Sequence, residues 1–281
     1  MDLELISRQP KASAKKSVPP LLFVHGAFCG AWVWTENFLP YFAEQGFVAY
    51  AMSLRGHGKS EGRAILPLTG LNDYVEDLAQ IIGTIGQPPI LIGHSMGGVV
   101  IQRYLQNNVL PGAVLLGAGP PHGMIASAVV TFVKNPILST KISLIPVLQL
   151  FGSSPTFMDM TRKTLFSDRI PEDKALDFLR RTQFESLRVV LDLSWPHAPR
   201  NPGTPLLVLG AEQDYFVTPY MVRATAKAYK TGAEIFPHMG HAMMVEAQWK
   251  ALAERIIKWI NDGLPGNPNS NQGNRMKVFS V

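Results

Sequence analysis

Several features that mark particular classes of protein are missing from this sequence. It has one cysteine, Cys29, so it cannot form an internal disulfide, and nothing in it calls for an oxidising compartment. The N-terminus has no apolar core of a signal peptide, and no apolar run reaches the ~18 residues of a membrane span. A cytoplasmic protein that does not insert stably into membranes is therefore the expectation.

Concentrated positive charge is also missing from the interior of the chain. The formal net charge is +5, and part of it lies in the two tails. Proteins that bind nucleic acids usually gather Lys and Arg on one face or helix, so nucleic acid is not an expected partner. Hydrophobic residues make up 46% of the chain and charged residues 17%, which is typical of a globular protein. The sequence leaves the oligomeric state open.

Short apolar segments alternate along the chain with amphipathic ones. Strands are expected at 21–28, 48–54, 90–93, 113–116, 206–209 and 234–236, and helices at 35–46, 71–86, 96–108, 218–230 and 249–260. Asn72 or Asp73 is the expected cap of the second helix. Fully apolar strands that alternate with helices predict an α/β fold, with a mostly parallel central sheet and helices on both faces. Sites in such sheets form beyond the carboxyl ends of the strands.

Residues 122–200 interrupt this alternation. The stretch 122–160 is almost free of charge, whereas 161–192 is rich in charged residues, a composition typical of helix surfaces. We interpret the whole segment as an inserted, largely helical cap over the functional edge of the sheet. The expected parts are a core of 1–121 and 201–262, the cap of 122–200, and a flexible C-terminal tail of 263–281 that is rich in Gly, Pro and Asn.

The main chemical signal is a G-x-S-x-G pentapeptide, Gly93 to Gly97, between an apolar strand and a helix. A serine on a sharp strand-to-helix turn is held in strained backbone geometry, and the glycines let neighbouring chain approach closely. The N-terminus of the following helix favours an anionic intermediate. Ser95 is thus a candidate nucleophile.

A serine hydroxyl is a weak nucleophile that needs a base, and the base needs a carboxylate to orient it. Downstream of Ser95 the chain offers both. Glu212 and Asp214 follow one expected strand, and His238 and His241 follow the last. The order along the chain is serine, acid, histidine.

With these motifs the sequence resembles the serine α/β-hydrolases over about residues 20 to 262. The resemblance rests on the His-Gly stretch after the first central strand, "RGHGKS", "GHSMGG", the acid loop "GAEQDYFVTP", and "GH" followed by Met-Val-Glu. It implies an α/β-hydrolase fold in which Ser95 is the nucleophile, Asp214 the acid and His241 the base. Glu212 remains a rival acid and His238 a rival base.

The resemblance also assigns roles to residues near these three. The oxyanion hole would be formed by the backbone N–H groups of Met96 and Ala27. His25, His57 and His94 occupy turn positions of the family and are interpreted as structural.

Two departures from the family pattern lead to expectations of their own. Ser53 stands where an Asp often precedes "RGHG", and we expect it to affect loop packing rather than chemistry. Fewer than ~20 residues precede the first central strand, so the opening hairpin of the fold is expected to shrink to one strand, Leu3 to Ser7.

The stretch "HGAFCGAWVW" is similar to the oxyanion stretch of plant methylesterases and hydroxynitrile lyases. The lyases carry Thr in place of Gly26, which favours the esterase side. The resemblance implies a carboxylesterase-like enzyme that cleaves small-molecule esters with an apolar acyl or alcohol part through an acyl-enzyme. No metal or organic cofactor is required. The expected lining of the substrate pocket is Phe28, Phe132, Leu148, Phe151 and Phe157.

Other activities remain open at this point. An acyltransferase, thioesterase, lipase, perhydrolase or C–C hydrolase would use the same triad, and a non-catalytic small-molecule receptor is a further alternative. The sequence does not identify the physiological ester or its chain length.

Overall fold

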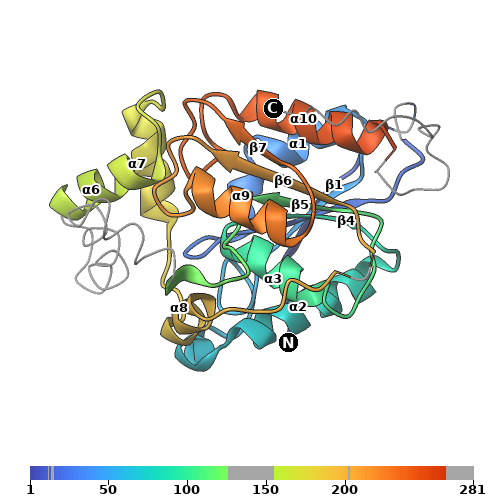
Figure 1. Cartoon of the computed structure of the whole chain (residues 1–281), viewed down its shortest axis with the longest axis horizontal. Coiled ribbons are helices and arrows are strands. Elements are labelled where there is room, and N and C mark those ends of the chain that lie inside the picture. The colour runs from blue at the N-terminus through green and yellow to red at the C-terminus, as the bar shows by residue number, and fades with distance from the viewer. Residues whose placement is uncertain (12, 14–15, 126–154, 202, 264–281) are drawn as a thin grey trace.

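The computed structural model describes residues 1–11, 13, 16–125, 155–201 and 203–263. Seven strands within these ranges form one sheet in the order β1-β3-β2-β4-β5-β6-β7 (Figure 1). β1 is antiparallel to β3, and every other neighbouring pair is parallel. The strands are β1 (Leu5–Arg8), β2 (Leu21–Val24), β3 (Ala49–Met52), β4 (Ile90–His94), β5 (Ala113–Leu116), β6 (Leu206–Ala211) and β7 (Ala233–Phe236). The predicted mostly parallel sheet is confirmed.

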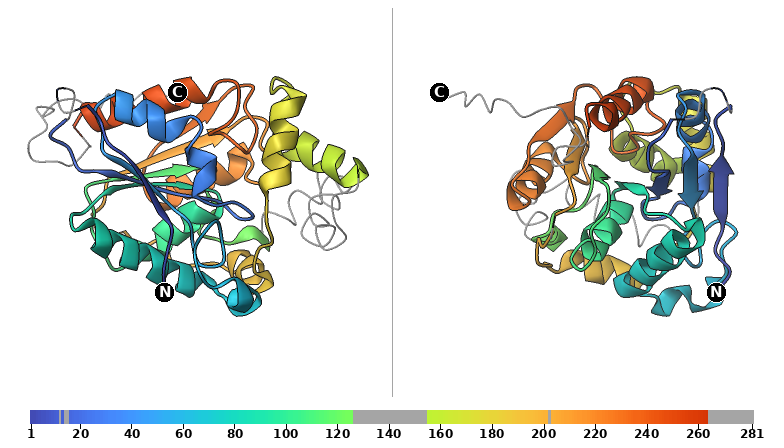
Figure 2. Two further views of the ribbon diagram at one scale, coloured as in Figure 1. Left: turned by 180° about the vertical axis from the view of Figure 1, so that it is seen from behind. Right: turned by 90° about the vertical axis from the view of Figure 1, so that its right-hand side faces the viewer.

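Helices cover both faces of this sheet (Figure 2). α1 (Phe38–Glu44) and α10 (Trp249–Asn261) pack on one face, and α2 (Leu71–Ile85), α3 (Met96–Tyr104) and α9 (Pro219–Ala228) pack on the other. Side chains of β2 alternate between the two layers, with Phe23 in the first core cluster and Leu22 in the second. Both faces of the central strands are buried, which is why those strands are apolar throughout.

One helix cap and some element boundaries differ from those expected. α2 begins after Gly70, so neither Asn72 nor Asp73 is its cap. Asp73 lies within the first turn, where its Oδ2 accepts a hydrogen bond of 2.6 Å from the N–H of Gly70. The expected helix at 35–46 starts only at Phe38, because a short 3-10 helix, η2 (Ala31–Trp34), precedes it. The opening strand lies at Leu5–Arg8, so it begins two residues later and ends one residue later than expected.

Three described helices lie between β5 and β6: α6 (Pro155–Leu165), α7 (Glu172–Arg181) and α8 (Leu187–Ser194). They lie at one end of the sheet (Figure 1). Phe178 of α7 belongs to the core cluster of α1 and α10, and Val189 of α8 belongs to that of α2 and α3. The described part of the insertion is therefore anchored in both layers. None of the helices in the described ranges is both long and apolar enough to cross a membrane.

Candidate active site

Ser95 occupies a strained turn between β4 and α3. Its backbone has φ 51° and ψ −116°, a combination that residues with a side chain rarely adopt. The flanking glycines are required by close contacts, because a Cβ on Gly97 would lie 2.4 Å from the carbonyl oxygen of His25, and one on Gly93 would lie 2.7 Å from that of Gly97. The local geometry thus explains the two glycines of the pentapeptide and the sharp turn at its serine.

The structure brings together three residues that are far apart in the chain. Ser95 Oγ lies 3.0 Å from His241 Nε2, and His241 Nδ1 lies 2.7 Å from Asp214 Oδ2. Asp214 and His241 are buried. The other carboxylate oxygen of Asp214 accepts hydrogen bonds of 2.8 Å from the N–H groups of Phe216 and Val217, which fixes its orientation. An imidazole held in this way can accept a proton from the serine hydroxyl.

The rival acid and base lie elsewhere. Glu212 and His238 are both exposed, and Glu212 Oε2 accepts a 2.9 Å hydrogen bond from the backbone N–H of His238. They belong to the same two loops as Asp214 and His241, but they contact each other on the surface. The geometry therefore favours Asp214 and His241 over their rivals.

His94 supports the backbone of His241. Its Nε2–H donates a 2.9 Å hydrogen bond to the carbonyl oxygen of His241, and the two ring centroids are 4.7 Å apart. Burial is the main cause that lowers the pKa of His94 well below its usual value, and the neighbouring His241 lowers it further. The ring is therefore neutral. These contacts fit the structural role expected for this residue.

His25 plays a similar part at the end of β2. Its Nε2 accepts a 3.0 Å hydrogen bond from Leu54 N–H, and its Nδ1–H donates one of 2.8 Å to Gly26. Burial, together with the charge of nearby His57, lowers the pKa of His25 to about 3. A neutral His25 therefore joins the turns after β2 and β3.

The two expected oxyanion donors flank Ser95. Met96 is the first residue of α3, where backbone N–H groups have no acceptor within the helix. Ala27 follows Gly26, and a Cβ on Gly26 would lie 3.1 Å from Ser95 Cβ and 2.8 Å from His94 Nδ1. The chain at this turn therefore runs directly beside the serine. A Thr at this position, as in the lyases, would require the His94 side chain to shift.

Ser53 joins two loops, as its expected role in packing requires. Its Oγ accepts a 2.8 Å hydrogen bond from Ala31 N–H and donates one of 2.6 Å to Glu4 Oε2. The same Glu4 oxygen accepts a bond of 3.1 Å from the N–H of Lys59. Glu4 thus supplies a carboxylate next to the place where related sequences often have an Asp. No sequence signal connected Glu4 with Ser53, because the two are distant in the chain.

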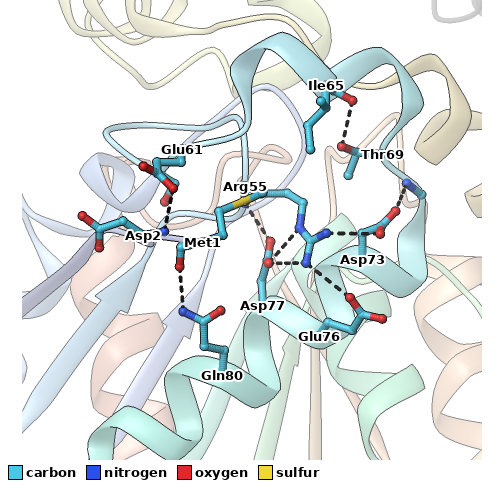
Figure 3. A network of polar contacts seen from close by, with 12 residues as sticks. Met1, Asp2, Arg55, Glu61, Ile65, Thr69, Asp73, Glu76, Asp77 and Gln80 are labelled. Carbon is cyan, nitrogen blue, oxygen red and sulfur yellow. Dashed lines mark hydrogen bonds and ion pairs between the residues drawn. The ribbon is translucent and has the colours of Figure 1, made fainter.

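The "RGHG" loop is fixed to α2 through Arg55 (Figure 3). The Arg55 guanidinium contacts Asp77 at 2.7 Å, Asp73 at 3.1 Å and Glu76 at 3.5 Å, and Arg55 N–H donates to Asp77 at 2.8 Å. Burial works to lower the pKa of Arg55, but the carboxylates of Asp77, Asp73 and Glu76 together more than offset it, and the pKa is raised. The loop is therefore held to α2 by ion pairs from one guanidinium to three carboxylates.

A second buried carboxylate lies beside the histidine loop. Both oxygens of Glu246 accept bonds from Ser167, 2.6 Å from its N–H and 2.7 Å from its hydroxyl, and Oε1 also accepts one of 3.0 Å from Gly240 N–H. Gly240 directly precedes His241, and Ser167 follows α6. Sequence reasoning included Glu246 only as part of a motif and gave it no role. The structure shows that it ties the insertion to the loop that carries His241.

Of the expected pocket residues, Phe28 is the one whose side chain the structure describes. Phe132, Leu148 and Phe151 lie outside the described residues, as does the side chain of Phe157 in α6. Phe28 is half-buried in the turn next to Ala27. Among the residues that the structure describes, there is no cluster of three or more His, Cys, Asp or Glu side chains that could hold a metal.

Comparisons with known proteins match the fold and the motifs. The chain is 30% identical over 110 residues to the bifunctional esterase/perhydrolase of Acinetobacter calcoaceticus, which covers 38% of this chain and 39% of that protein. It is 37% identical over 68 residues to the monoacylglycerol lipase of Mycolicibacterium smegmatis, or 22% of this chain and 24% of the lipase. The matches thus span less than half the length of these relatives.

A solved structure is similar over nearly the whole chain. The esterase of Exiguobacterium antarcticum superposes with a TM-score of 0.73 at 16% identity, covering 92% of this chain and 95% of that one. At this level of identity the likeness concerns the fold alone. The model of the alpha/beta hydrolase family matches residues 21–255, from β2 into α10. The chain therefore belongs to the alpha/beta hydrolase family.

Proposed function

We propose that the protein is a serine esterase that cleaves carboxylic esters through an acyl-enzyme on Ser95. The observation that carries this proposal is the continuous chain of contacts from Ser95 Oγ through the His241 ring to the buried Asp214 carboxylate, at 3.0 and 2.7 Å. Such a chain activates a serine hydroxyl that is otherwise a weak nucleophile. Relatives named as an esterase/perhydrolase and a monoacylglycerol lipase support ester chemistry.

In the first half of the reaction, His241 Nε2 takes the hydroxyl proton as Ser95 Oγ attacks the ester carbonyl carbon. The negative charge that develops on the carbonyl oxygen is stabilised by the backbone N–H groups of Ala27 and Met96. Asp214 stabilises the imidazolium and does not itself take the proton. His241 then returns its proton to the departing alkoxide, which leaves as an alcohol, and the acyl group remains on Ser95.

In the second half, His241 removes a proton from a water molecule, and the resulting hydroxide attacks the acyl carbonyl. The same two N–H groups stabilise the second tetrahedral intermediate. Its collapse releases a carboxylic acid and returns the proton to Ser95 Oγ. The enzyme is restored after one turnover without any metal or organic cofactor taking part.

The insertion acts in this proposal as a cap of 122–200 that shapes the substrate pocket. Its described part lies between β5 and β6 and contacts both loops beside Ser95. Gln183 N–H donates to the carbonyl oxygen of Phe28 at 2.9 Å, and Ala242 N–H donates to that of Leu165 at 3.1 Å. The half-buried Phe28 and the apolar composition of 122–160 favour an ester with an apolar acyl or alcohol part.

The experiment is a chain-length series of p-nitrophenyl esters on the wild type and on Ser95→Ala. We expect turnover by the wild type and a loss of at least about 10⁴-fold in Ser95→Ala, because the nucleophile is absent. A fluorophosphonate should label Ser95, as located by mass spectrometry, and block turnover. Glu212→Gln and His238→Gln are matched controls and should keep wild-type rates. Ester turnover that persists at the wild-type rate in Ser95→Ala would refute the assignment.

A further inference from the structure

The insertion contributes a buried carboxylate to the neighbourhood of the oxyanion turn. Glu185 lies between α7 and α8, and its side chain is fully buried. Its Oε1 accepts hydrogen bonds of 2.6 Å from the Tyr74 hydroxyl and 2.8 Å from Ser186 N–H. Its Oε2 lies 3.1 Å from His57 Nε2 and 3.4 Å from Phe28 N–H. Most charged residues of 161–192 are exposed, so this one is the exception to their expected surface role.

Phe28 needs such support because of its backbone. Its φ is +65°, in the left-handed region that disfavours a bulky side chain. Both of its backbone polar groups are bonded to the insertion: the N–H to Glu185 Oε2 and the carbonyl oxygen to Gln183 N–H, the latter at 2.9 Å. Since Phe28 directly follows Ala27, these bonds constrain the peptide next to the expected oxyanion donor.

The same short segment between α7 and α8 also forms hydrogen bonds with the "RGHG" loop. Gln183 Oε1 accepts a 3.0 Å hydrogen bond from Gly58 N–H, and its Nε2 donates one of 3.0 Å to the carbonyl oxygen of Gly56. His57, between these two glycines, pairs with Glu185. Although burial opposes charge on both groups, their mutual attraction raises the pKa of His57 and lowers that of Glu185. An ionised Glu185 is therefore held by contacts with α2, with the "RGHG" loop and with the Phe28 turn.

We propose that Glu185 is a positioning residue for the oxyanion hole. It fixes the Phe28 turn so that Ala27 N–H points at the reacting carbonyl oxygen. The proposal rests on the proposed esterase function, and it adds that the insertion takes part in transition-state stabilisation as well as in lining the pocket. Its action is indirect, because the carboxylate reaches the backbone of Phe28 and not the ester.

The test is Glu185→Gln, which keeps the size of the side chain and removes its charge. The readout is the ratio of kcat/KM for p-nitrophenyl butyrate to that for its thiono analogue, in which sulfur replaces the carbonyl oxygen. Sulfur is larger and a poorer acceptor, so the thiono ester gains little from the oxyanion donors. We expect the ratio to fall about tenfold, less than the ~10²–10³ for outright loss of a donor. A smaller amount of correctly folded enzyme would lower both rates equally and leave the ratio unchanged.

A second variant and a matched control make the outcome decisive. Tyr74→Phe removes one hydrogen bond from the Glu185 carboxylate and should lower the same ratio by less, which keeps the proposal testable if Glu185→Gln does not fold. Asp192→Asn is the control: Asp192 Oδ2 accepts a 2.8 Å bond from Leu71 N–H and so joins α8 to α2 away from the oxyanion turn. It should leave the ratio unchanged.

The possible failures are distinguishable. If the wild type turns over esters through Ser95 but the ratio is unchanged in Glu185→Gln, or in Tyr74→Phe where Glu185→Gln does not fold, the positioning role is overturned and the esterase stands. If Asp192→Asn lowers the ratio as much as Glu185→Gln, general docking of the insertion replaces the specific role of Glu185. If the wild type does not cleave esters, the proposed function is overturned and the positioning role is overturned with it.

Discussion

Two buried carboxylate–histidine pairs lie at the same edge of this molecule. In one, Asp214 holds His241 at 2.7 Å, and the far nitrogen of the ring faces the hydroxyl of Ser95. In the other, Glu185 holds His57 at 3.1 Å, and the far nitrogen lies 3.1 Å from the backbone carbonyl oxygen of Arg55. A carbonyl oxygen has no proton to give. The group that faces the second ring nitrogen therefore distinguishes the two pairs. The first pair is suited to catalysis, and the second is suited to holding loops together.

The two pairs also differ in their other partners. Asp214 accepts hydrogen bonds from two backbone N–H groups of its own loop, so its orientation is set locally. Glu185 accepts hydrogen bonds from the Tyr74 hydroxyl of α2 and from Phe28 N–H of the oxyanion turn, so it joins parts of the chain that are distant in sequence. The first arrangement orients one ring, and the second holds separate segments together.

The largest expected effect is on the first pair. Asp214→Asn keeps the shape of the side chain but places a neutral amide opposite His241 Nδ1, which favours the wrong tautomer of the ring. We expect kcat to fall about 10⁴-fold. Steady-state kinetics with p-nitrophenyl butyrate would measure this. A fall of less than about tenfold would mean that the two pairs do not differ in the way described.

The next effect concerns the pH dependence of the second pair. The pKa of His57 is raised above its usual 6.5, so its contribution to stability is complete below that pH and is lost as the pH rises through the folded-state pKa. The pKa of Glu185 is lowered from 4.5, so its contribution is complete above that value and is lost on acidification. The pair is therefore most stabilising between these two values.

Comparison of the wild type with His57→Gln tests this by urea denaturation from pH 6 to pH 9. We expect the wild type to have the larger free energy of unfolding at pH 6, by about 2 kcal/mol. The difference should shrink as the pH rises above 6.5 and through the folded-state pKa of His57, because the advantage of the charged pair is then lost. A difference that stays constant over this range would show that folding does not raise the pKa of His57.

The smallest effect comes from Glu246, a buried carboxylate that accepts hydrogen bonds from Ser167 and Gly240. Ser167→Ala removes the hydroxyl that donates to Glu246 Oε2 at 2.7 Å and leaves the backbone N–H bond in place. We expect the free energy of unfolding to fall by about 1.5 kcal/mol. The loss should be the same at pH 6 and pH 9, in contrast to that of His57→Gln. A loss that depended on pH would place a titrating partner near Glu246.

Much of the fold could be predicted from the sequence, because the signals for it are local. The apolar run of Leu21–Val24 and the stripe of Trp249–Asn261 each indicate one element without knowledge of the rest of the chain. Gly93 and Gly97 could likewise be explained before the structure, since their role is to permit close approach within one turn. The candidate triad was accessible because each member ends or follows a strand whose position was predicted.

The contacts that could not be predicted join distant segments through single side chains. Glu185 lies in a segment with many other charged residues. Nothing in its local sequence distinguishes this buried carboxylate from exposed neighbours such as Asp177. Glu4 and Ser53 form their hydrogen bond only because β1 pairs with β3. The cap of α2 was missed for a different reason: the cap residue is Gly70, whereas Asp73 acts from the first turn.

The anchoring of the insertion in both layers has a consequence for how the molecule comes apart. Phe178 is part of the core on one side of the sheet and Val189 is part of the core on the other. Detaching α7 and α8 would expose apolar surface on each side at once, so these helices share the cooperative unit of the sheet instead of forming an independent foldon. Calorimetry should accordingly record a single endotherm.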